Sequence, residues 1–247
     1  MTDANPAWYQ TWFDTSYYHT LYQDRDVHEA QFFLQNLISR LPIHKTDDIL
    51  DVACGRGRHS LYLAKEGFNV IGLDLSPNSI AFAKRKAANQ GLNATFNVHD
   101  MRTVAPKQAS VLLNLFTSIG YFEDRQDNDK TIMAFYESLL PNGIAVIDFM
   151  HVSLVKKHLV ADEVVTKDGI TFTINRTCAA GWITKNISFT ENGTTYAFQE
   201  RVAALELNDF KQMLEQVGFT VEHTFGNYSL DPFSPETAER LILVARK

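Results

Sequence analysis

Short apolar runs alternate with amphipathic stretches through much of the first 150 residues. Five of the apolar runs have the length of buried strands and lie at residues 49–52, 70–74, 95–98, 111–115 and 144–149. Three of the stretches between them carry apolar side chains at helical spacing, at residues 60–66, 77–90 and 128–140. This alternation predicts a parallel sheet with helices on both faces, joined by right-handed crossovers.

The pattern changes near residue 163 and returns near residue 208. Residues 163–201 alternate with a period of two and contain a turn signal at Glu191-Asn192-Gly193, which is typical of antiparallel strands. A helix at 208–217 and strands at 219–224 and 241–245 then resume the α/β pattern. We therefore predict an α/β fold with a three-layer, doubly wound, mostly parallel seven-stranded sheet and an inserted antiparallel β meander.

These boundaries divide the chain into three parts. Residues 45–150 together with 206–247 form the predicted core, and residues 151–205 form an inserted β lobe that is a substrate lid or a dimer contact. Residues 1–44 form a helical segment that is rich in aromatic side chains and ends in an amphipathic helix at 27–41. The aromatic stretch is either a helix packed on the core or a lid whose tyrosines touch a ligand.

Composition and charge narrow the class of protein. The chain has 247 residues, 45% of them hydrophobic and 21% charged, which suits one globular domain with a small additional lobe. The net charge of −6 argues against broad binding to duplex DNA, because such binding needs Lys and Arg to neutralise phosphates. Two isolated cysteines, Cys54 and Cys178, exclude a disulfide framework and a clustered zinc site.

The same observations give expectations about place and assembly. No apolar run approaches the roughly 20 residues that a membrane span needs, and the first residues have no signal-peptide pattern. We expect a cytoplasmic protein without membrane attachment or bound metal, as a monomer or a homodimer.

The most specific chemistry lies where the first two predicted strands end. Gly55 and Gly57 follow the first strand and allow the backbone to turn sharply and approach a ligand closely. Asp74 ends the second strand, where a carboxylate can accept both ribose hydroxyls of an adenosine. Together these features predict a nucleoside-binding crevice at the carboxyl ends of the strands.

Two further residues distinguish between cofactors. Asp51 stands just before the glycine turn, where it would repel a pyrophosphate but suit a cationic ammonium or sulfonium. Ser60 occupies the position where the dinucleotide fingerprint has Gly or Ala. Both observations favour S-adenosylmethionine over a nicotinamide dinucleotide.

Four segments of the chain resemble successive motifs of the class I S-adenosylmethionine-dependent methyltransferases. They are residues 50–57 (LDVACGRG), 72–76 (GLDLS), 99–102 (HDMR) and 140–143 (LPNG). The resemblance covers residues 45–150 closely and extends to the C-terminal segments near 217–219 and 241–246. It implies S-adenosyl-L-methionine as cofactor and S-adenosyl-L-homocysteine as product, without identifying the substrate.

The resemblance also implies roles for particular residues. Those expected beside the methionine part are Asp51, Ala53, Gly55 and Gly57. Those expected at the adenosine are Asp74 for the ribose, Leu75 against the adenine, and Asp100 and Met101 at its amino group and edge. Those expected near the sulfonium are Asn114, Leu115 and Phe116, with Tyr18 or Tyr22 closing over the methionine part.

Methyl transfer from a sulfonium is an in-line displacement that needs positioning and exclusion of water more than dedicated catalytic groups. A base is needed only when the nucleophile carries a proton, and the candidates by position are His151 or Asp148, before His59 and Tyr121. The predicted function is methyl transfer to a small molecule. RNA or protein methylation, for which Arg56, Arg58 and the basic run 84–86 leave room, and non-catalytic S-adenosylmethionine binding are the alternatives.

Overall fold

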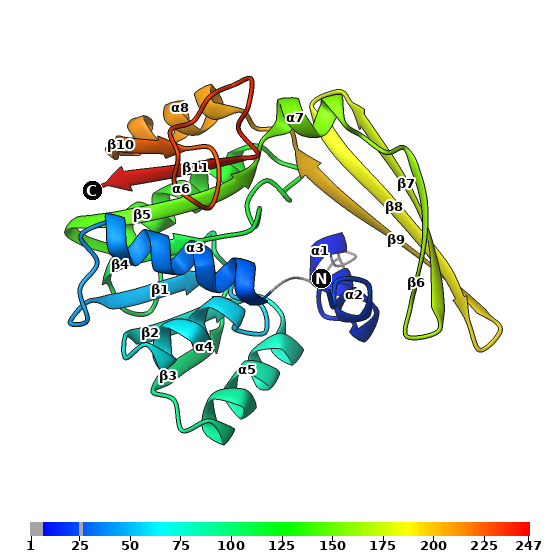
Figure 1. Cartoon of the computed structure of the whole chain (residues 1–247), viewed down its shortest axis with the longest axis horizontal. Coiled ribbons are helices and arrows are strands. Elements are labelled where there is room, and N and C mark those ends of the chain that lie inside the picture. Colours follow the sequence, from blue (N-terminus) through cyan, green and yellow to red (C-terminus); the bar gives the residue numbers. More distant parts are fainter. Residues whose placement is uncertain (1–6, 25–26) are drawn as a thin grey trace, which may run out of the picture.

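The computed structural model describes residues 7–24 and 27–247 (Figure 1). Within these residues one sheet has seven strands: β1 Asp48–Val52, β2 Asn69–Asp74, β3 Ala94–Val98, β4 Ala109–Asn114, β5 Leu139–Met150, β10 Thr220–Phe225 and β11 Arg240–Arg246. Their order across the sheet is β10-β11-β5-β4-β1-β2-β3. All neighbours are parallel except β11, which pairs antiparallel with both β5 and β10. The predicted fold class is confirmed.

Helices cover both faces of this sheet. In Figure 1, α3 (Val27–Arg40), α4 (Arg58–Lys65) and α5 (Pro77–Asn89) lie on the near face, and α6 (Gln126–Ser138) and α8 (Leu207–Val217) lie behind it. Successive side chains of each central strand point to opposite faces of the sheet. Ile49 of β1 packs toward α3 and α4, whereas Leu50 packs toward α6 and α8. Burial on both faces explains why these strands are continuous apolar runs.

Local signals set the helix boundaries close to those expected. Ser76 caps α5, its hydroxyl accepting a hydrogen bond from the Ser79 amide at 3.0 Å, and Pro77 occupies the first turn. The prediction missed α7 (Val152–Lys157), a short helix after β5, and β5 begins at Leu139, inside the stretch predicted as helix. Both differences fall at element ends, where patterns of periodicity are weakest.

The inserted region forms a second, antiparallel sheet, as predicted. Its four strands among the described residues are β6 Asp162–Lys167, β7 Ile170–Ala179, β8 Trp182–Glu191 and β9 Thr194–Ala203. Each pairs with the next along the chain, so the sheet is a simple meander. The amide of Ala203 at the end of β9 donates to the carbonyl of Gly120 at 2.8 Å, which ties this sheet to the loop that follows β4.

Two short helices lie between the two sheets, α1 (Trp8–Trp12) and α2 (Ser16–Leu21) (Figure 1). Trp12 and Leu21 are buried against the inner face of the meander, where Phe172 and Phe189 meet them. Thr15 separates the two helices, its hydroxyl accepting from the Tyr18 amide at 3.1 Å as the cap of α2. Residues 1–6 and 25–26 of the predicted N-terminal lid lie outside the described residues.

Candidate active site

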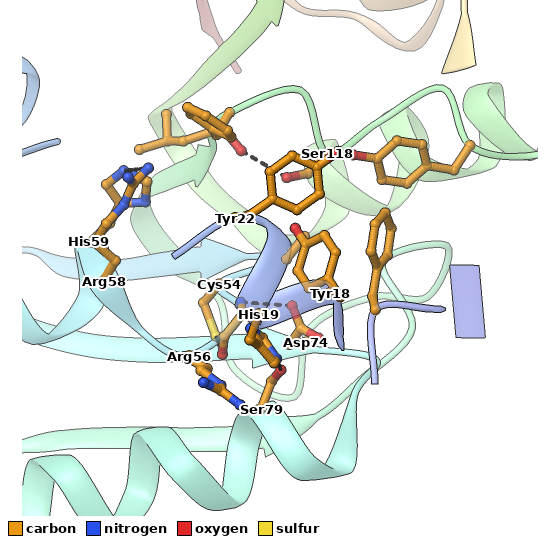
Figure 2. Close-up of a pocket in the computed structure, with 16 residues that line it drawn as sticks. Tyr18, His19, Tyr22, Cys54, Arg56, Arg58, His59, Asp74, Ser79 and Ser118 are labelled. Carbon is orange, nitrogen blue, oxygen red and sulfur yellow. Dashed lines mark hydrogen bonds between the residues drawn. The ribbon is translucent and has the colours of Figure 1, made fainter. Parts of the chain in front are cut away.

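A crevice opens at the carboxyl ends of β1, β2 and β4, beneath α1 and α2 (Figure 2). It has two adjoining parts. Both parts are lined by Phe13, Ala53, Asp74, Ser118 and Tyr121, so they form one continuous space. The edge where parallel strands of such a sheet end is the place where ligands bind in doubly wound folds.

The glycine turn after β1 forms one wall of the crevice. Gly55 has a φ of +55°, and a Cβ added there would meet no atom within 4 Å, so this position faces open space. Gly57 has a φ of +79°, and a Cβ added there would lie 3.0 Å from the Phe96 ring and 3.2 Å from Ala83. The first glycine therefore keeps the crevice open, whereas the second allows close packing of the turn on the fold.

Asp74 closes the turn from the neighbouring strand. One carboxylate oxygen accepts from the Gly55 amide at 2.7 Å and the other from the Ser76 amide at 2.8 Å. Burial raises the pKa of the Asp74 carboxyl, although the two amides partly offset this effect. Figure 2 shows the side chain at the centre of the crevice, and an ionised carboxylate still has lone pairs for two ligand hydroxyls.

Asp51 lies beneath the turn and does not line the crevice. Its carboxyl is 1% exposed and accepts a hydrogen bond from the Ser60 hydroxyl at 2.5 Å. Burial, and then the charge of Asp74, raises the pKa of Asp51 to about 6. The sequence placed Asp51 directly beside the cofactor. In the structure Asp51 lies beneath the glycine turn and lines neither part of the crevice. Ser60 is the hydrogen-bond partner of the buried acid.

The raised pKa of Asp51 predicts a pH dependence of stability. The folded state binds a proton more tightly than the unfolded chain, whose carboxyl has a pKa of 3.8. The contribution of Asp51 to the free energy of unfolding therefore falls by about 3 kcal/mol as the pH rises from roughly 4 to 6. We expect Asp51→Asn to remove this fall when urea unfolding is followed against pH, and Glu137→Gln, at an exposed acid, to retain it. Parallel curves for the protein and Asp51→Asn would contradict the expectation.

The second part of the crevice is lined by Leu75, Asp100 and Met101 in addition to Asp74. Arg102 holds the Asp100 carboxylate, with Nη2 at 2.6 Å from Oδ2 and Nε at 3.0 Å from Oδ1. Burial raises the pKa of Asp100, but the hydrogen bonds from Arg102 outweigh it and the pKa is lowered. Asp100 is therefore a fixed, ionised acceptor at this end of the crevice.

The helices α1 and α2 close the crevice from above. Tyr18 and Tyr22 line it together with Phe13, and Figure 2 shows Tyr18 beside Asp74. The Tyr22 hydroxyl donates to Glu200 of β9 at 2.8 Å, and Lys185 of β8 donates to the Tyr22 oxygen at 2.5 Å. The lid residues are thus held from the meander side.

A second set of contacts fastens the lid to the core. Asp14, between α1 and α2, accepts from the Ser76 hydroxyl at 2.5 Å and from the Asn78 amide at 3.0 Å. Since the Ser76 amide also donates to Asp74, the lid is anchored two residues away from the acid that faces the crevice. Nothing in the apolar pattern of the lid pointed to this contact.

The end of β4 forms the remaining wall. Phe116 and Thr117 have φ values of +63° and +59°, and Leu115, Phe116 and Ser118 line the crevice. Asn114 is buried just before them, its Nδ2 donating to the Val52 carbonyl at 3.1 Å, while its Oδ1 has no hydrogen-bond partner among the described residues. Asn114 lines neither part of the crevice, so it lies behind the wall that Leu115, Phe116 and Ser118 form.

Comparisons with known proteins match this geometry. A family model described as a methyltransferase domain matches residues 49–143, which span the glycine turn, Asp74 and the end of β4. This match and the relatives described next support a class I S-adenosylmethionine-dependent methyltransferase. A protein of Geobacillus sp. (strain WCH70) named as a methyltransferase is 27% identical over 94% of this chain and 97% of its own.

Two further comparisons are with a relative in sequence and with a solved structure. A dTDP-3-amino-3,4,6-trideoxy-alpha-D-glucopyranose N,N-dimethyltransferase of Streptomyces venezuelae is 30% identical over 49% of this chain and 48% of its own length. The crystal structure of an S-adenosylmethionine-dependent methyltransferase from Clostridium acetobutylicum ATCC 824 shares the fold, with a TM-score of 0.79 at 19% identity over 93% of this chain and 95% of that one. S-adenosylmethionine is the cofactor that the methyltransferase family match supports.

The position of Asp148 does not support its expected role as a base. Its carboxylate is 1% exposed and does not line the crevice. It accepts from Arg240 Nε at 2.8 Å, from the Tyr228 hydroxyl at 3.1 Å and from the Phe116 amide at 2.8 Å. Burial and the charge of Asp148 raise the pKa of Tyr228, so this phenol stays protonated. Asp148 instead fixes the left-handed loop after β4.

His151 is also outside the crevice. It lies 7% exposed before α7, its Nδ1 donating to the Ala238 carbonyl at 2.6 Å. Because a carbonyl can only accept, this ring nitrogen carries the proton. The ring faces Phe233 at a centroid distance of 5.2 Å in a separate hollow next to α8. Neither His151 nor Asp148, the two expected candidates for a general base, lines the crevice, and each has a hydrogen-bond partner elsewhere.

Several crevice residues escaped the sequence reasoning or were set aside by it. His59 lines the crevice, and burial, with the charge of Arg58, lowers its pKa to about 3, so the imidazole is neutral. Tyr121 lines both parts, and its hydroxyl donates to the Thr117 carbonyl. The sequence showed that His59 and Tyr121 follow predicted strands. It did not show that their side chains point into the crevice.

The ribose assignment gives a direct test. Asp74→Ala removes the acceptor proposed for two ligand hydroxyls and frees the Gly55 amide. We expect the affinity for S-adenosylhomocysteine to fall by about 1–3 kcal/mol, measured by calorimetric titration. Asp231→Ala, at an exposed acid of the last loop, is the control and leaves the affinity unchanged. Equal affinities of the protein and Asp74→Ala would refute this placement of the ribose.

Within the described residues, the longest apolar helical stretch falls short of what crossing a membrane requires.

Proposed function

We propose that this methyltransferase transfers a methyl group to an amine nitrogen of a small molecule. The observation that carries the proposal is the wall of the crevice opposite the glycine turn, which is built from aromatic rings. The rings are those of Phe13, Tyr18, Tyr22, Phe116 and Tyr121. Aromatic faces attract cations, and this attraction grows where water is excluded.

This wall would stabilise a cation both before and after methyl transfer. S-adenosylmethionine supplies an electrophilic methyl on a sulfonium when bound, and positive charge moves to the acceptor as the methyl is transferred. When the acceptor is an amine, the product nitrogen keeps that charge, and the rings stabilise it. Only the neutral form of the amine can attack, so an acceptor that is an ammonium in water first gives its proton to solvent, and the rings then stabilise the ammonium product.

The proposed roles of the individual residues follow the crevice from end to end. Ala53, Gly55 and Gly57 would border the methionine part, with Asp51 acting from beneath the turn. Asp74 would hold the ribose, Leu75 the adenine face, and Asp100 and Met101 its amino group and edge. Asn114 and Leu115 would lie beside the transferred methyl, with Tyr18 and Tyr22 above. The open space at Gly55 and the acceptors of Asp74 fit a nucleoside of this size and polarity.

The lid restricts the size of the acceptor. Because α1 and α2 are fastened both to Ser76 and to Glu200, the crevice lies under ordered side chains and not on an open surface. The Streptomyces venezuelae relative is by name an enzyme that dimethylates the nitrogen of an amino sugar. Both points support a small amine over a macromolecule.

Some wider expectations remain proposals. We infer that residues 1–44 act as the lid, that residues 45–150 and 206–247 form the catalytic core, and that residues 151–205 support the lid or form a dimer contact. The two free cysteines are consistent with a cytoplasmic location. The net charge of −6 is consistent with the expectation that duplex DNA is not a partner.

The proposal is tested by offering matched acceptors. Purified protein is incubated with S-adenosylmethionine and a panel of small amines, each paired with the alcohol of the same skeleton, and S-adenosylhomocysteine is measured. We expect turnover of one or more amines and none of their alcohols. Turnover of alcohols alone, or of RNA or protein alone, would refute the proposal, and cofactor binding without any turnover would favour a non-catalytic binding protein.

A further inference from the structure

Arg56 lies on the glycine turn, between the two glycines, and lines the crevice (Figure 2). Its guanidinium lies 4.6 Å from the centroid of the Phe82 ring of α5, which fixes the direction of a side chain that is otherwise exposed. His19 of the lid and Ser79 of α5 line the same part of the crevice, 3.4 Å apart. The cation therefore stands at the rim of the site.

The charge of Arg56 is not balanced by the protein. Among the described residues no carboxylate lies within ion-pair distance of it, and the charged neighbour that acts on it is Arg85. Burial, and then Arg85, lowers the pKa of Arg56. A guanidinium in this setting gains by meeting an anion, since hydrogen bonds between opposite charges are about twice as strong as neutral ones.

The other charges of the crevice are already engaged. Asp74 accepts from two backbone amides, and Asp51 beneath the turn lies close enough to Arg58 for that cation to lower its pKa. The cofactor carries a sulfonium, an ammonium and one carboxylate, so it adds net positive charge to the crevice. None of the described carboxylates lies beside Arg56, so its charge is open to an anionic group of the methyl acceptor.

We propose that Arg56, with Arg85 beside it, forms a subsite for an acidic group, a phosphate or a carboxylate, on the methyl acceptor. The inference rests on the proposed function and narrows its substrate class to amines that carry an acid. It also accounts for the basic residues of the turn and of α5. On a chain of net charge −6 they form a local anion site and not an extended nucleic-acid face.

Inorganic phosphate is the probe that tests this subsite. Protein saturated with S-adenosylhomocysteine is titrated with phosphate and followed by phosphorus NMR. We expect saturable binding that Arg56→Gln weakens about tenfold and Arg85→Gln weakens less. Arg40→Gln is the matched control, because Arg40 is also exposed and also lies over an aromatic ring, Phe225, but does not line the crevice. This variant binds phosphate as the unaltered protein does.

Each other outcome overturns the inference. One is the absence of saturable phosphate binding, and another is equal weakening by Arg40→Gln. If Arg56→Gln lowers the affinity for S-adenosylhomocysteine itself about tenfold, Arg56 binds the carboxylate of the cofactor instead. If a single-stranded RNA displaces phosphate and its binding weakens steeply with salt, the basic rim belongs to RNA.

The amine panel keeps the two proposals apart. Methylation of amines without an acid, together with no phosphate binding, leaves the proposed function standing and removes this inference. Phosphate binding at Arg56 with no amine methylated does the opposite, because the anion subsite stands while the amine assignment fails.

Discussion

Replacing Asp148 with asparagine lowers the free energy of unfolding by about 3–5 kcal/mol. The carboxylate is 1% exposed and pairs with Arg240, whose side chain is itself mostly buried. Asparagine keeps one acceptor oxygen but has no charge, so Arg240 is left as a buried cation without a counter-ion. Burial lowers the pKa of Arg240, and the charge of Asp148 is the largest effect that opposes this, so the variant loses the main group that stabilises the buried cation.

Urea unfolding measures this effect, and the chain offers a matched control. Glu222 pairs with Arg246 at the other end of β11 at 2.5 Å, but these side chains are 30% and 31% exposed, so water screens the pair. We expect Glu222→Gln to cost less than about 1 kcal/mol, because exposed ion pairs contribute little. A similar small loss for Asp148→Asn would contradict the view that Asp148 is the structural anchor of the loop after β4.

Gly55→Val abolishes cofactor binding while the protein still folds. The added side chain would point into open space in the crevice, so it occupies the volume proposed for the methionine part. We expect the affinity for S-adenosylhomocysteine to fall by more than about 4 kcal/mol, which is roughly a thousandfold. The left-handed backbone costs the fold about 1–2 kcal/mol.

Gly72→Val distinguishes a ligand-facing glycine from a packing glycine. A Cβ at Gly72 would lie 2.5 Å from the Phe96 ring and 2.9 Å from Cys54 Sγ, so this variant is expected to unfold. Circular dichroism and calorimetric titration of both variants test the contrast. If Gly55→Val unfolds, or binds the cofactor normally, the assignment of that face of the turn is wrong.

The crevice was predictable from sequence because strand ends converge in space. Gly55 and Asp74 each follow a buried strand, and the carboxyl ends of neighbouring parallel strands meet at one edge. Position along the chain was therefore enough to bring them together, and the 2.7 Å contact between them follows. The antiparallel meander was equally visible, since a period of two cannot be read as a helix.

The engagement of Asp148 was not visible in the sequence, because position in a strand does not reveal side-chain partners. Asp148 lies two residues before the end of β5, and Arg240 and Tyr228, far along the sequence, bind it. The hydrogen bonds of Asp14 to α5 and of Glu200 to Tyr22 likewise join distant segments. Such polar contacts have no periodicity, so only the folded arrangement shows which acids are engaged.

The most direct test of the account is a calorimetric titration of the unaltered protein at one salt concentration. The ligands are S-adenosylmethionine, S-adenosylhomocysteine and NAD. We expect S-adenosylmethionine and S-adenosylhomocysteine to bind with dissociation constants on the order of 1 μM, and NAD not to bind. Preference for NAD, or no binding of any of the three, would contradict the assignment of the crevice between Gly55 and Asp74.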